Sequence, residues 1–211
     1  MLRKLLALST LVVLATAANA QAPKGFKLRI DRSTSASDPD AAGTVKVAQM
    51  SPGFHVTAPQ AAVIWSPDSV AKGAFTLKGT FHLMTPSNHT NYYGLVFGGG
   101  DLDGPKQNYM YFLIAQDGTW LIKHRANDTE IHEIVKKTPS EAIRKPSEPG
   151  KSTPNDLEVR VTKDRIDYVV NGTVVHTMKA ADGHFPNADG LYGVRINHML
   201  DVHVEKFGAA R

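Results

Sequence analysis

The sequence predicts an all-β protein, folded as a two-sheet antiparallel jelly-roll sandwich. Short stretches that alternate apolar and polar residues follow one another from Thr44 onward, which is typical of half-buried strands. Asp117-Gly118 and Asn171-Gly172 each separate two such stretches, as in two-residue hairpins. Only one helix signal is convincing, so the pattern indicates a sandwich or a barrel. Long loops near residues 99–107 and 144–154 favour the sandwich, because they break the even meander of an up-and-down barrel.

The first twenty residues differ from the rest of the 211-residue chain. Two basic residues precede the apolar run Leu5–Ala17, and Ala18–Ala20 offers the small residues that a signal peptidase reads. The run is shorter than the roughly 20 apolar residues of a membrane-spanning helix. We therefore expect residues 1–20 to be a cleaved signal peptide, which makes the protein secreted or periplasmic with no transmembrane segment after cleavage.

The remaining chain suits one domain. Residues 21–43 are interpreted as an extended segment, because Asp31–Asp40 is polar and has little to bury. Residues 44–211 are expected to form a single β-sandwich domain, since typical domains hold about 100–200 residues. The sequence has no cysteine, so no disulfide can stabilise the fold.

The strands are expected in sequence order between turn signals. Asn91–Phe97 and Asn108–Ala115 are apolar on both faces, which suits central strands, and Lys163-Asp164 predicts a third hairpin. The capping box Thr138–Glu141 predicts one or two turns of helix that end before Pro146. The other expected strands are Thr44–Met50, Phe54–Ala58, Ala62–Trp65, Gly73–Met84, Thr119–His124, Leu157–Thr162, Arg165–Val170, Thr173–Met178, Leu191–Asn197 and Asp201–Phe207.

The charge distribution argues against a nucleic-acid partner. The net charge of +4 includes Arg3 and Lys4, so removal of these two residues leaves +2. The remaining basic residues are scattered among Asp and Glu, whereas a nucleic-acid-binding protein should show a basic stripe. We therefore expect no nucleic acid to bind.

Four blocks within residues 73–207 carry a resemblance to a known family. They are Tyr93–Gly99, Tyr109–Ile114 with Asp117–Trp120, Asn155–Val159 with Tyr168–Gly172, and Gly190–Arg195. Together they resemble the concanavalin A-like lectin/glucanase superfamily, in particular its laminin-G-like or 3-keto-disaccharide-hydrolase-like modules. The resemblance implies a concanavalin A-like sandwich and a carbohydrate partner. Each block is a strand or a hairpin, so the resemblance supports the fold more strongly than the function.

The catalytic motif of the glucanase branch is absent. No Glu-x-Asp-x-x-Glu strand occurs, and Glu130 and Glu133 would face opposite sides of a strand. Asp164 lies in a predicted turn. The sequence therefore assigns no catalytic residue, and it leaves open whether the protein is an enzyme; if it is one, a hydrolase of glycosidic bonds is expected.

A row of polar side chains is the predicted ligand site. Arg195 and Asn197 lie on the polar side of an expected strand whose other side is apolar. With His203 they are predicted to line a concave sheet and to bind a glycan. Trp120 and Tyr93 are candidate platforms on which a sugar ring could stack, although aromatic residues of a sandwich more often pack in its core.

A glycine-rich loop holds the predicted metal ligands. Asp101 and Asp103 follow three consecutive glycines, and carboxylate oxygens are ligands that calcium prefers. The resemblance adds weight, because laminin-G-like and lectin-like domains often bind calcium in loops. Otherwise this loop is a solvated turn, and no other cofactor is expected. The nine histidines show no H-x-H or H-E-x-x-H spacing, so they are interpreted as surface or hydrogen-bonded residues.

These observations leave three hypotheses about function. The leading one is a secreted or periplasmic carbohydrate-interacting domain that binds a sugar on a concave sheet. The second is a glycoside hydrolase that acts on 3-keto-glycosides or related sugars. The third is a non-catalytic envelope domain that binds another protein.

Overall fold

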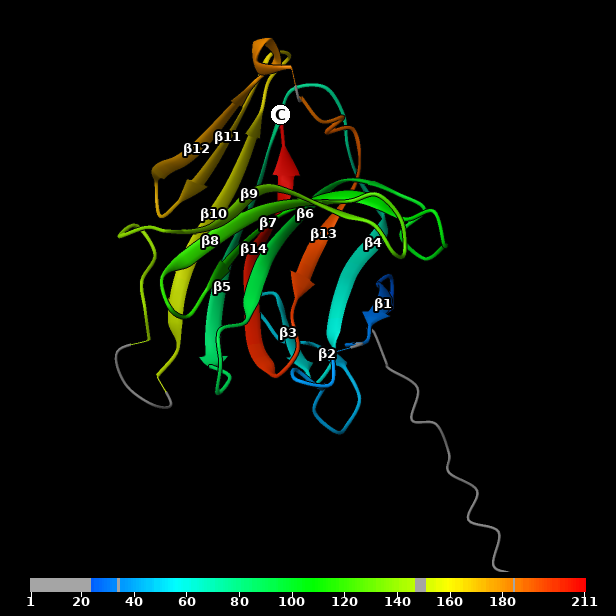
Figure 1. The fold of residues 1–211 in the computed structure, drawn as a ribbon, viewed down its shortest axis with the longest axis vertical. Helices are drawn as coiled ribbons and strands as arrows, with labels where there is room; N and C mark the ends of the chain where they lie inside the picture. The colour runs from blue at the N-terminus through cyan, green and yellow to red at the C-terminus, as the bar shows by residue number, and fades with distance from the viewer. Residues whose placement is uncertain (1–23, 34, 147–150, 184) are drawn as a thin grey trace, which may run out of the picture.

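Two antiparallel sheets of seven strands each pack face to face (Figure 1). The structure is a computed structural model and describes residues 24–33, 35–146, 151–183 and 185–211. The expected fold class, an all-β two-sheet sandwich, is confirmed. The predicted signal peptide, residues 1–20, lies outside the described residues.

The sheet nearer the viewer in Figure 1 is called the front sheet, and the other the back sheet. In spatial order the front sheet contains β1 (Lys27–Asp31), β4 (Ala61–Ala71), β13 (Gly190–Ile196), β6 (Tyr92–Gly100), β7 (Asn108–Ala115), β8 (Thr119–Arg125) and β9 (Ile131–Pro139). The back sheet contains β12 (Thr173–Lys179), β11 (Arg165–Val170), β10 (Thr153–Val161), β5 (Phe75–Thr85), β14 (Leu200–Ala210), β3 (Phe54–Ala58) and β2 (Lys46–Gln49).

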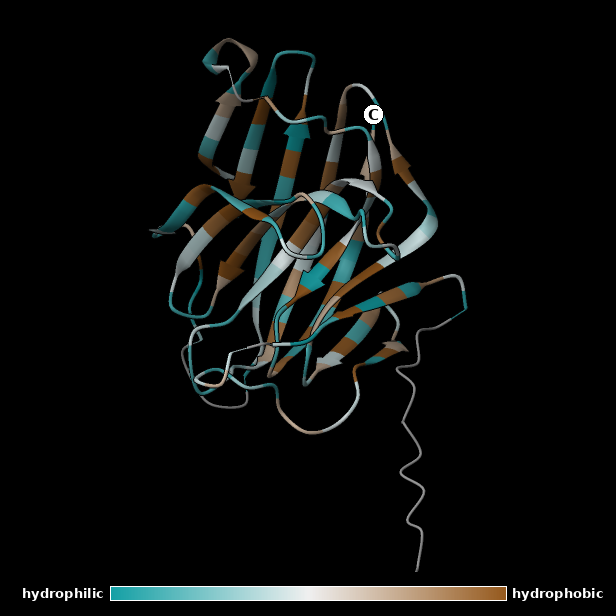
Figure 2. Cartoon of the chain, turned by 45° about the vertical axis from the view of Figure 1, so that its right-hand side comes forward, coloured by the Kyte–Doolittle hydropathy of each residue, from teal (hydrophilic) through white to brown (hydrophobic). Residues whose placement is uncertain are grey.

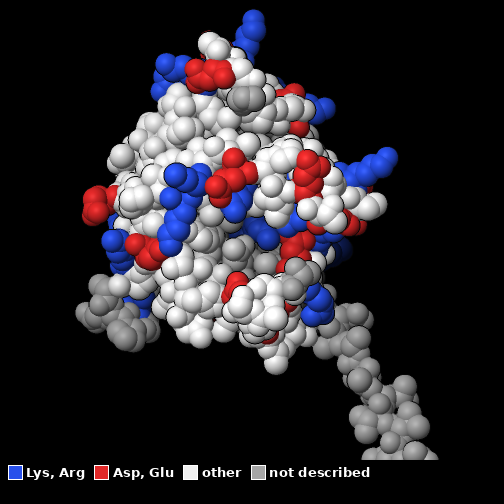
Figure 3. All heavy atoms as spheres, in the orientation of Figure 1, with Lys and Arg blue, Asp and Glu red and all other residues white. Residues whose placement is uncertain are grey.

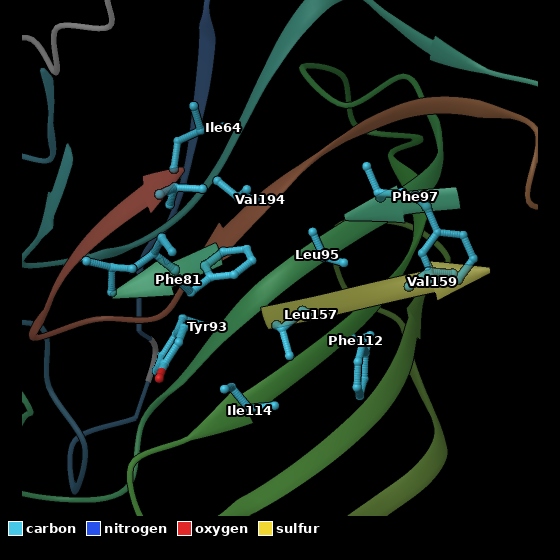
Figure 4. Close-up of a cluster of buried hydrophobic side chains, with 14 of the residues drawn as sticks. Ile64, Phe81, Tyr93, Leu95, Phe97, Phe112, Ile114, Leu157, Val159 and Val194 are labelled. Atoms are coloured by element: carbon cyan, nitrogen blue, oxygen red, sulfur yellow. The ribbon is translucent and has the colours of Figure 1, made fainter. Parts of the chain in front are cut away.

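The core lies between the two sheets. Because successive side chains of a strand point to opposite faces, alternation places one set of each strand inside, and Figure 2 shows apolar and polar residues alternating along many strands. Figure 4 shows the centre of this core, where Tyr93, Leu95 and Phe97 of β6 face Leu157 and Val159 of β10. All five residues are buried. Burial of this shared apolar surface holds the sheets together without disulfides.

The predicted hairpins are confirmed, with one difference in turn geometry. Asn171 and Gly172 join β11 to β12 with φ of 49° and 82°, as a two-residue turn requires. Between β7 and β8, however, only Gly118 has a positive φ, of 84°. Its amide donates to the Ala115 carbonyl at 3.1 Å, so this connection is a three-residue loop in place of the expected two-residue turn.

The helix predicted from Thr138 does not form. Thr138 and Pro139 continue β9, and the residues after Ser140 make a tight turn in which the Ile143 amide donates to the Ser140 carbonyl at 3.3 Å. The sheet pairing of Trp120 with Thr138 outweighs the capping signal, because it extends the β8–β9 ladder. Within the described residues, a 3₁₀ turn at Ala180–Asp182 is the helical element.

The N-terminal segment contributes a strand to the front sheet. Lys27–Asp31 pairs antiparallel with β4, Asp31 opposite Ala61, as the edge strand β1. This strand belongs to the segment that the sequence predicted to be merely extended. No helix among the described residues is long and apolar enough to cross a membrane.

Candidate functional site

Charged side chains gather on the outer face of the front sheet. Alternation in β13 sends Val194 and Ile196 into the core and Arg195 to the opposite face, as predicted. Arg125 at the end of β8 and Asp31 at the end of β1 meet it there. Figure 3 shows acidic and basic side chains side by side across this face of the molecule.

One carboxylate is shared by three guanidinium groups. Asp31 accepts from Arg195, from Arg125 at 3.3 Å and from Arg29 at 3.3 Å. Arg195 also donates to the Tyr109 hydroxyl at 3.0 Å. Burial by itself raises the pKa of Asp31, but the guanidiniums, Arg195 foremost, outweigh burial and hold that pKa below its usual value. Asp31 is therefore a charged anchor that fixes the orientation of the arginines.

Buried aromatic residues of the same face pack beside these charged groups. Tyr109 and Tyr111 of β7 are buried there, and the Arg195 guanidinium lies 5.5 Å from the centre of the Tyr111 ring. Burial raises the pKa of Tyr111, so its hydroxyl stays protonated. Leu102 of the loop after β6 packs on this cluster, so the aromatic rings are covered.

A hollow of about 290 Å³ opens beside this ion cluster. It lies at the end of the sheet where β1 and β13 finish and β4 and β6 begin, and Arg125, from the other end of the sheet at the end of β8, reaches it across the outer face. Its lining is polar and consists of Asp31, Arg32, Ser33, Ser35, Asp38, Ala61, Asn91, Arg125, Arg195, Asn197 and His198. Two buried atoms of this lining, Arg125 Nε and Asn197 Oδ1, have no hydrogen-bond partner among the described residues. Such atoms are uncommon, because an unpaired buried polar group costs free energy.

Three potential metal ligands converge at the edge of the hollow. Asp38 Oδ1 lies 2.8 Å from His89 Nε2 and 3.1 Å from His198 Nε2, and the two Nε2 atoms are 3.1 Å apart. Among the described residues, this is the group of three or more carboxylate and imidazole atoms that could hold a metal ion. Its members come from three loops far apart in the sequence.

The predicted ligand row is divided between the two sheets. Arg195 and Asn197 both line the hollow. His203 lies on the outer face of the back sheet, where its ring centre is 6.1 Å from that of His55 and 5.7 Å from that of His82. The structure thus brings together two of the three residues, since β13 and β14 belong to different sheets.

The two candidate platforms lie between the sheets. Tyr93 and Trp120 are 1% and 3% exposed and belong to the core cluster, where Trp120 packs at 6.2 Å on Phe112. Burial also raises the pKa of Tyr93. In this arrangement neither ring offers a face to a ligand.

The predicted calcium ligands take part in contacts within the protein. Asp101 accepts from the Lys106 amide at 3.0 Å, and Asp103 forms an ion pair of 2.6 Å with Lys27. The hydrogen bond from Lys27 lowers the pKa of Asp103. Calcium ligation by Asp101 and Asp103 stays a prediction.

Several residues of the hollow escaped sequence reasoning. Asp31 and Asp38 were placed in an extended segment, and Arg125 ends a strand without any motif around it. His89 and His198 are separated by more than a hundred residues. The alternating Lys-Leu-Arg-Ile-Asp of β1 was the one local signal that could have drawn attention to Asp31.

No family model matches the sequence, and no curated protein matches it either. Solved structures do match. A carbohydrate binding module, CBM66 from Bacillus subtilis, has a TM-score of 0.59 at 12% identity and covers 89% of this chain and 96% of its own. A Bacillus subtilis protein of unknown function with a galectin-like fold has a TM-score of 0.57 at 13% identity, covering 88% and 89%. The GH16 protein of the Bacteroides ovatus mixed linkage glucan PUL has a TM-score of 0.55 at 9% identity, covering 87% and 94%.

These structures share one architecture with the present chain. The chain has a concanavalin A-like sandwich fold. At these identities the likeness concerns the fold alone. Within this concanavalin A-like sandwich, the hollow by Asp31 and Arg195 contains two buried polar atoms that lack a hydrogen-bond partner among the described residues.

Proposed function

We propose that the protein binds a carbohydrate in the hollow on the outer face of the front sheet. The observation that carries the proposal is the pair of unpartnered buried atoms in its lining, the donor Arg125 Nε and the acceptor Asn197 Oδ1. A sugar hydroxyl both donates and accepts hydrogen bonds, so neighbouring hydroxyl groups can satisfy both atoms once small shifts of the two side chains turn them towards the hollow.

The size and charge of the hollow indicate which kind of sugar it can bind. Its volume of about 290 Å³ is just below the roughly 300–1,000 Å³ of small-molecule sites, which suits one sugar unit. The lining holds Arg32, Arg125 and Arg195 against the two carboxylates Asp31 and Asp38, so positive charge is in excess. This excess favours a sugar that carries an acidic substituent.

The similar structures support the same class of ligand. One of these structures is described as a carbohydrate binding module, and another as a GH16 protein in complex with a product. In the present chain, hydrogen bonds of planar polar side chains would orient the sugar in place of stacking, because the rings of Trp65, Tyr109 and Tyr111 on this face are buried.

The binding proposal is tested by titration calorimetry with neutral monosaccharides, uronic acids and 3-keto sugars. We expect saturable binding of one sugar class with one site per chain. Asn197→Ala should weaken it about tenfold, the loss of about 1.4 kcal/mol that one hydrogen bond can supply. His203→Ala, on the opposite sheet, is the matched control and should leave affinity unchanged. Absence of binding at millimolar concentrations would reject the proposal and favour the protein-interaction hypothesis.

Catalysis is the second candidate, and one contact favours it. Asp38 and His198 form an acid–imidazole pair of 3.1 Å on the wall of the hollow, and such pairs serve as general acid–base groups. Turnover of a 3-keto-glycoside or a related glycoside, abolished by Asp38→Asn with sugar binding retained, would establish a hydrolase. Binding without turnover would leave the protein as a carbohydrate-binding domain.

We also propose that the protein is exported with loss of residues 1–20. The three-part pattern of those residues supports export. Intact-mass measurement of the protein from the periplasm or medium should give a chain that begins at Gln21; a chain that retains Met1 would contradict cleavage.

A further inference from the structure

We propose that Asp38, His89 and His198 form a binding site for a divalent transition-metal ion such as Zn²⁺. Asp38 lies in the loop that follows β1, His89 in the loop between β5 and β6, and His198 in the turn between β13 and β14. The proposal does not depend on the sugar, because it concerns the protein's own side chains.

The distances match a metal centre. The three facing atoms, Asp38 Oδ1, His89 Nε2 and His198 Nε2, are separated by 2.8, 3.1 and 3.1 Å. Ligands about 2.0–2.1 Å from Zn²⁺ lie roughly 2.9–3.4 Å from one another. An ion can therefore bind at the centre of the triangle after shifts of a few tenths of an ångström.

The far nitrogen of each imidazole is held by an oxygen atom. His198 Nδ1 lies 3.2 Å from Asp40 Oδ1, and His89 Nδ1 lies 2.7 Å from Asn88 Oδ1. A carboxylate only accepts, so in the tautomer with its proton on Nδ1 His198 donates to Asp40 and leaves Nε2 free to bind an ion. Histidine ligands of metals commonly donate their other N–H to a carboxylate in this way, which fixes the tautomer and the ring orientation.

The near nitrogens consequently present lone pairs to a carboxylate. With its proton on Nδ1, His89 Nε2 is an acceptor; the Asn91 amide nitrogen lies 3.1 Å from it, and an ion would displace that contact from the lone pair. In the tautomer that donates to Asp40, His198 Nε2 is an acceptor as well. Three electron-rich atoms, one of them in a carboxylate, thus converge within hydrogen-bond distance. A bound cation would remove their mutual repulsion.

The site is open to an arriving ion. The side chains of Asp38 and His89 are 49% and 39% exposed, whereas that of His198 is 7% exposed and gives the site a fixed wall. Asp38 lines both the 290 Å³ hollow and a second hollow of about 600 Å³ that His89 also lines. Three protein ligands with coordination positions left open are typical of reactive zinc sites.

The ligand set selects the class of metal. Imidazole nitrogen suits Zn²⁺ and its transition-metal neighbours, whereas Ca²⁺ and Mg²⁺ prefer an all-oxygen shell. We therefore expect the site to prefer Zn²⁺ and Co²⁺ to Ca²⁺.

The test is a Zn²⁺ titration of the chelator-treated, sugar-free protein by calorimetry. We expect one ion per chain, and Asp38→Asn and His89→Ala should each weaken binding by more than about tenfold. His132→Ala is the matched control, because His132 lies 3.4 Å from His124 and 2.6 Å from Glu130 without forming a converging triangle. It should leave the high-affinity site unchanged.

A spectroscopic measurement distinguishes the loss of a metal ligand from the loss of the fold. Co²⁺ bound by two imidazoles and a carboxylate should give visible d–d absorption that is lost in Asp38→Asn, while circular dichroism and the thermal midpoint of that variant match the parent. Binding that survives both Asp38→Asn and His89→Ala, or that His132→Ala abolishes, would overturn the proposal, as would a failure to bind Zn²⁺ at millimolar concentration. Failure here leaves the sugar proposal intact, because the two titrations are separate.

Discussion

At the scale of single residues, Asp31 does the most to organise the front face. Its carboxylate contacts Arg29, Arg125 and Arg195, and two of these arginines line the hollow. Without it, the guanidiniums would repel one another in a poorly solvated place. The residue therefore links the stability of the sheet edge to the shape of the proposed sugar site.

Asp31→Asn should destabilise the protein by about 3 kcal/mol at pH 7, because it leaves buried positive charges unneutralised. The pKa of Asp31 is lowered in the folded state, so its contribution is present above the unfolded pKa of about 3.9 and is lost as pH falls through the folded value. The difference between parent and variant in urea unfolding should thus shrink below about pH 4.

Asp103→Asn is the matched control for this prediction. Asp103 also pairs with a basic side chain, but at the exposed surface, where an ion pair contributes little. The control should unfold at nearly the same urea concentration as the parent. An Asp31→Asn variant as stable as this control would show that the ion cluster is not a stabilising feature.

At the scale of elements, local turn signals were reliable and one helix signal was not. Asn171-Gly172 forms a hairpin that requires positive φ at both residues, a local preference that the sequence could predict. The capping box at Thr138 predicted a helix, yet β8 offers this segment a neighbouring strand. β9 was missed because most of its residues are exposed, which leaves no apolar alternation to detect.

The residues of the hollow were predictable only in part, because only some of their properties depend on the local sequence. Alternation in β13 predicted the outward direction of Arg195, which is a local property. The meeting of Asp31, Arg125 and Arg195 depends on strand order, and the approach of Asp38 to His89 and His198 depends on loop paths. Neither strand order nor loop path has a local signal in a single sequence.

Gly172→Ala tests the hairpin at this scale. Its φ of 82° disfavours a side chain, although a Cβ there would meet no atom within 4 Å. The variant should lose about 1 kcal/mol in urea unfolding from backbone strain alone. Gly208→Ala is the control, since a Cβ there also has free space and no positive φ opposes it. Equal losses in the two variants would contradict a turn that depends on positive φ.

At the scale of the whole molecule, the two sheets share one core. Strands of both sheets contribute to the same buried cluster, so neither sheet can cover its apolar face without the other. The outer cluster around Trp65 and Tyr109 rests on the front sheet and is covered by a loop of that sheet. The molecule should therefore unfold as one unit.

This prediction can be checked with the two tryptophans. Trp65 reports on the outer face of the front sheet, and Trp120 on the shared core. In Trp65→Phe and in Trp120→Phe, the urea midpoint from the remaining tryptophan's fluorescence should coincide with the midpoint from far-ultraviolet circular dichroism. Separate midpoints in either variant would show that the outer cluster opens before the core.

The strand order also sets when the chain can fold during synthesis. β13 and β14 follow all the other strands in the sequence, yet β13 lies between β4 and β6, and β14 lies between β5 and β3. Until Gly190–Ala210 has left the ribosome, each sheet exists only as two unconnected pieces with open edges. A nascent chain of this protein consequently cannot complete either sheet before these two strands emerge, and until then it is in a state in which a polypeptide can still be threaded through a narrow channel.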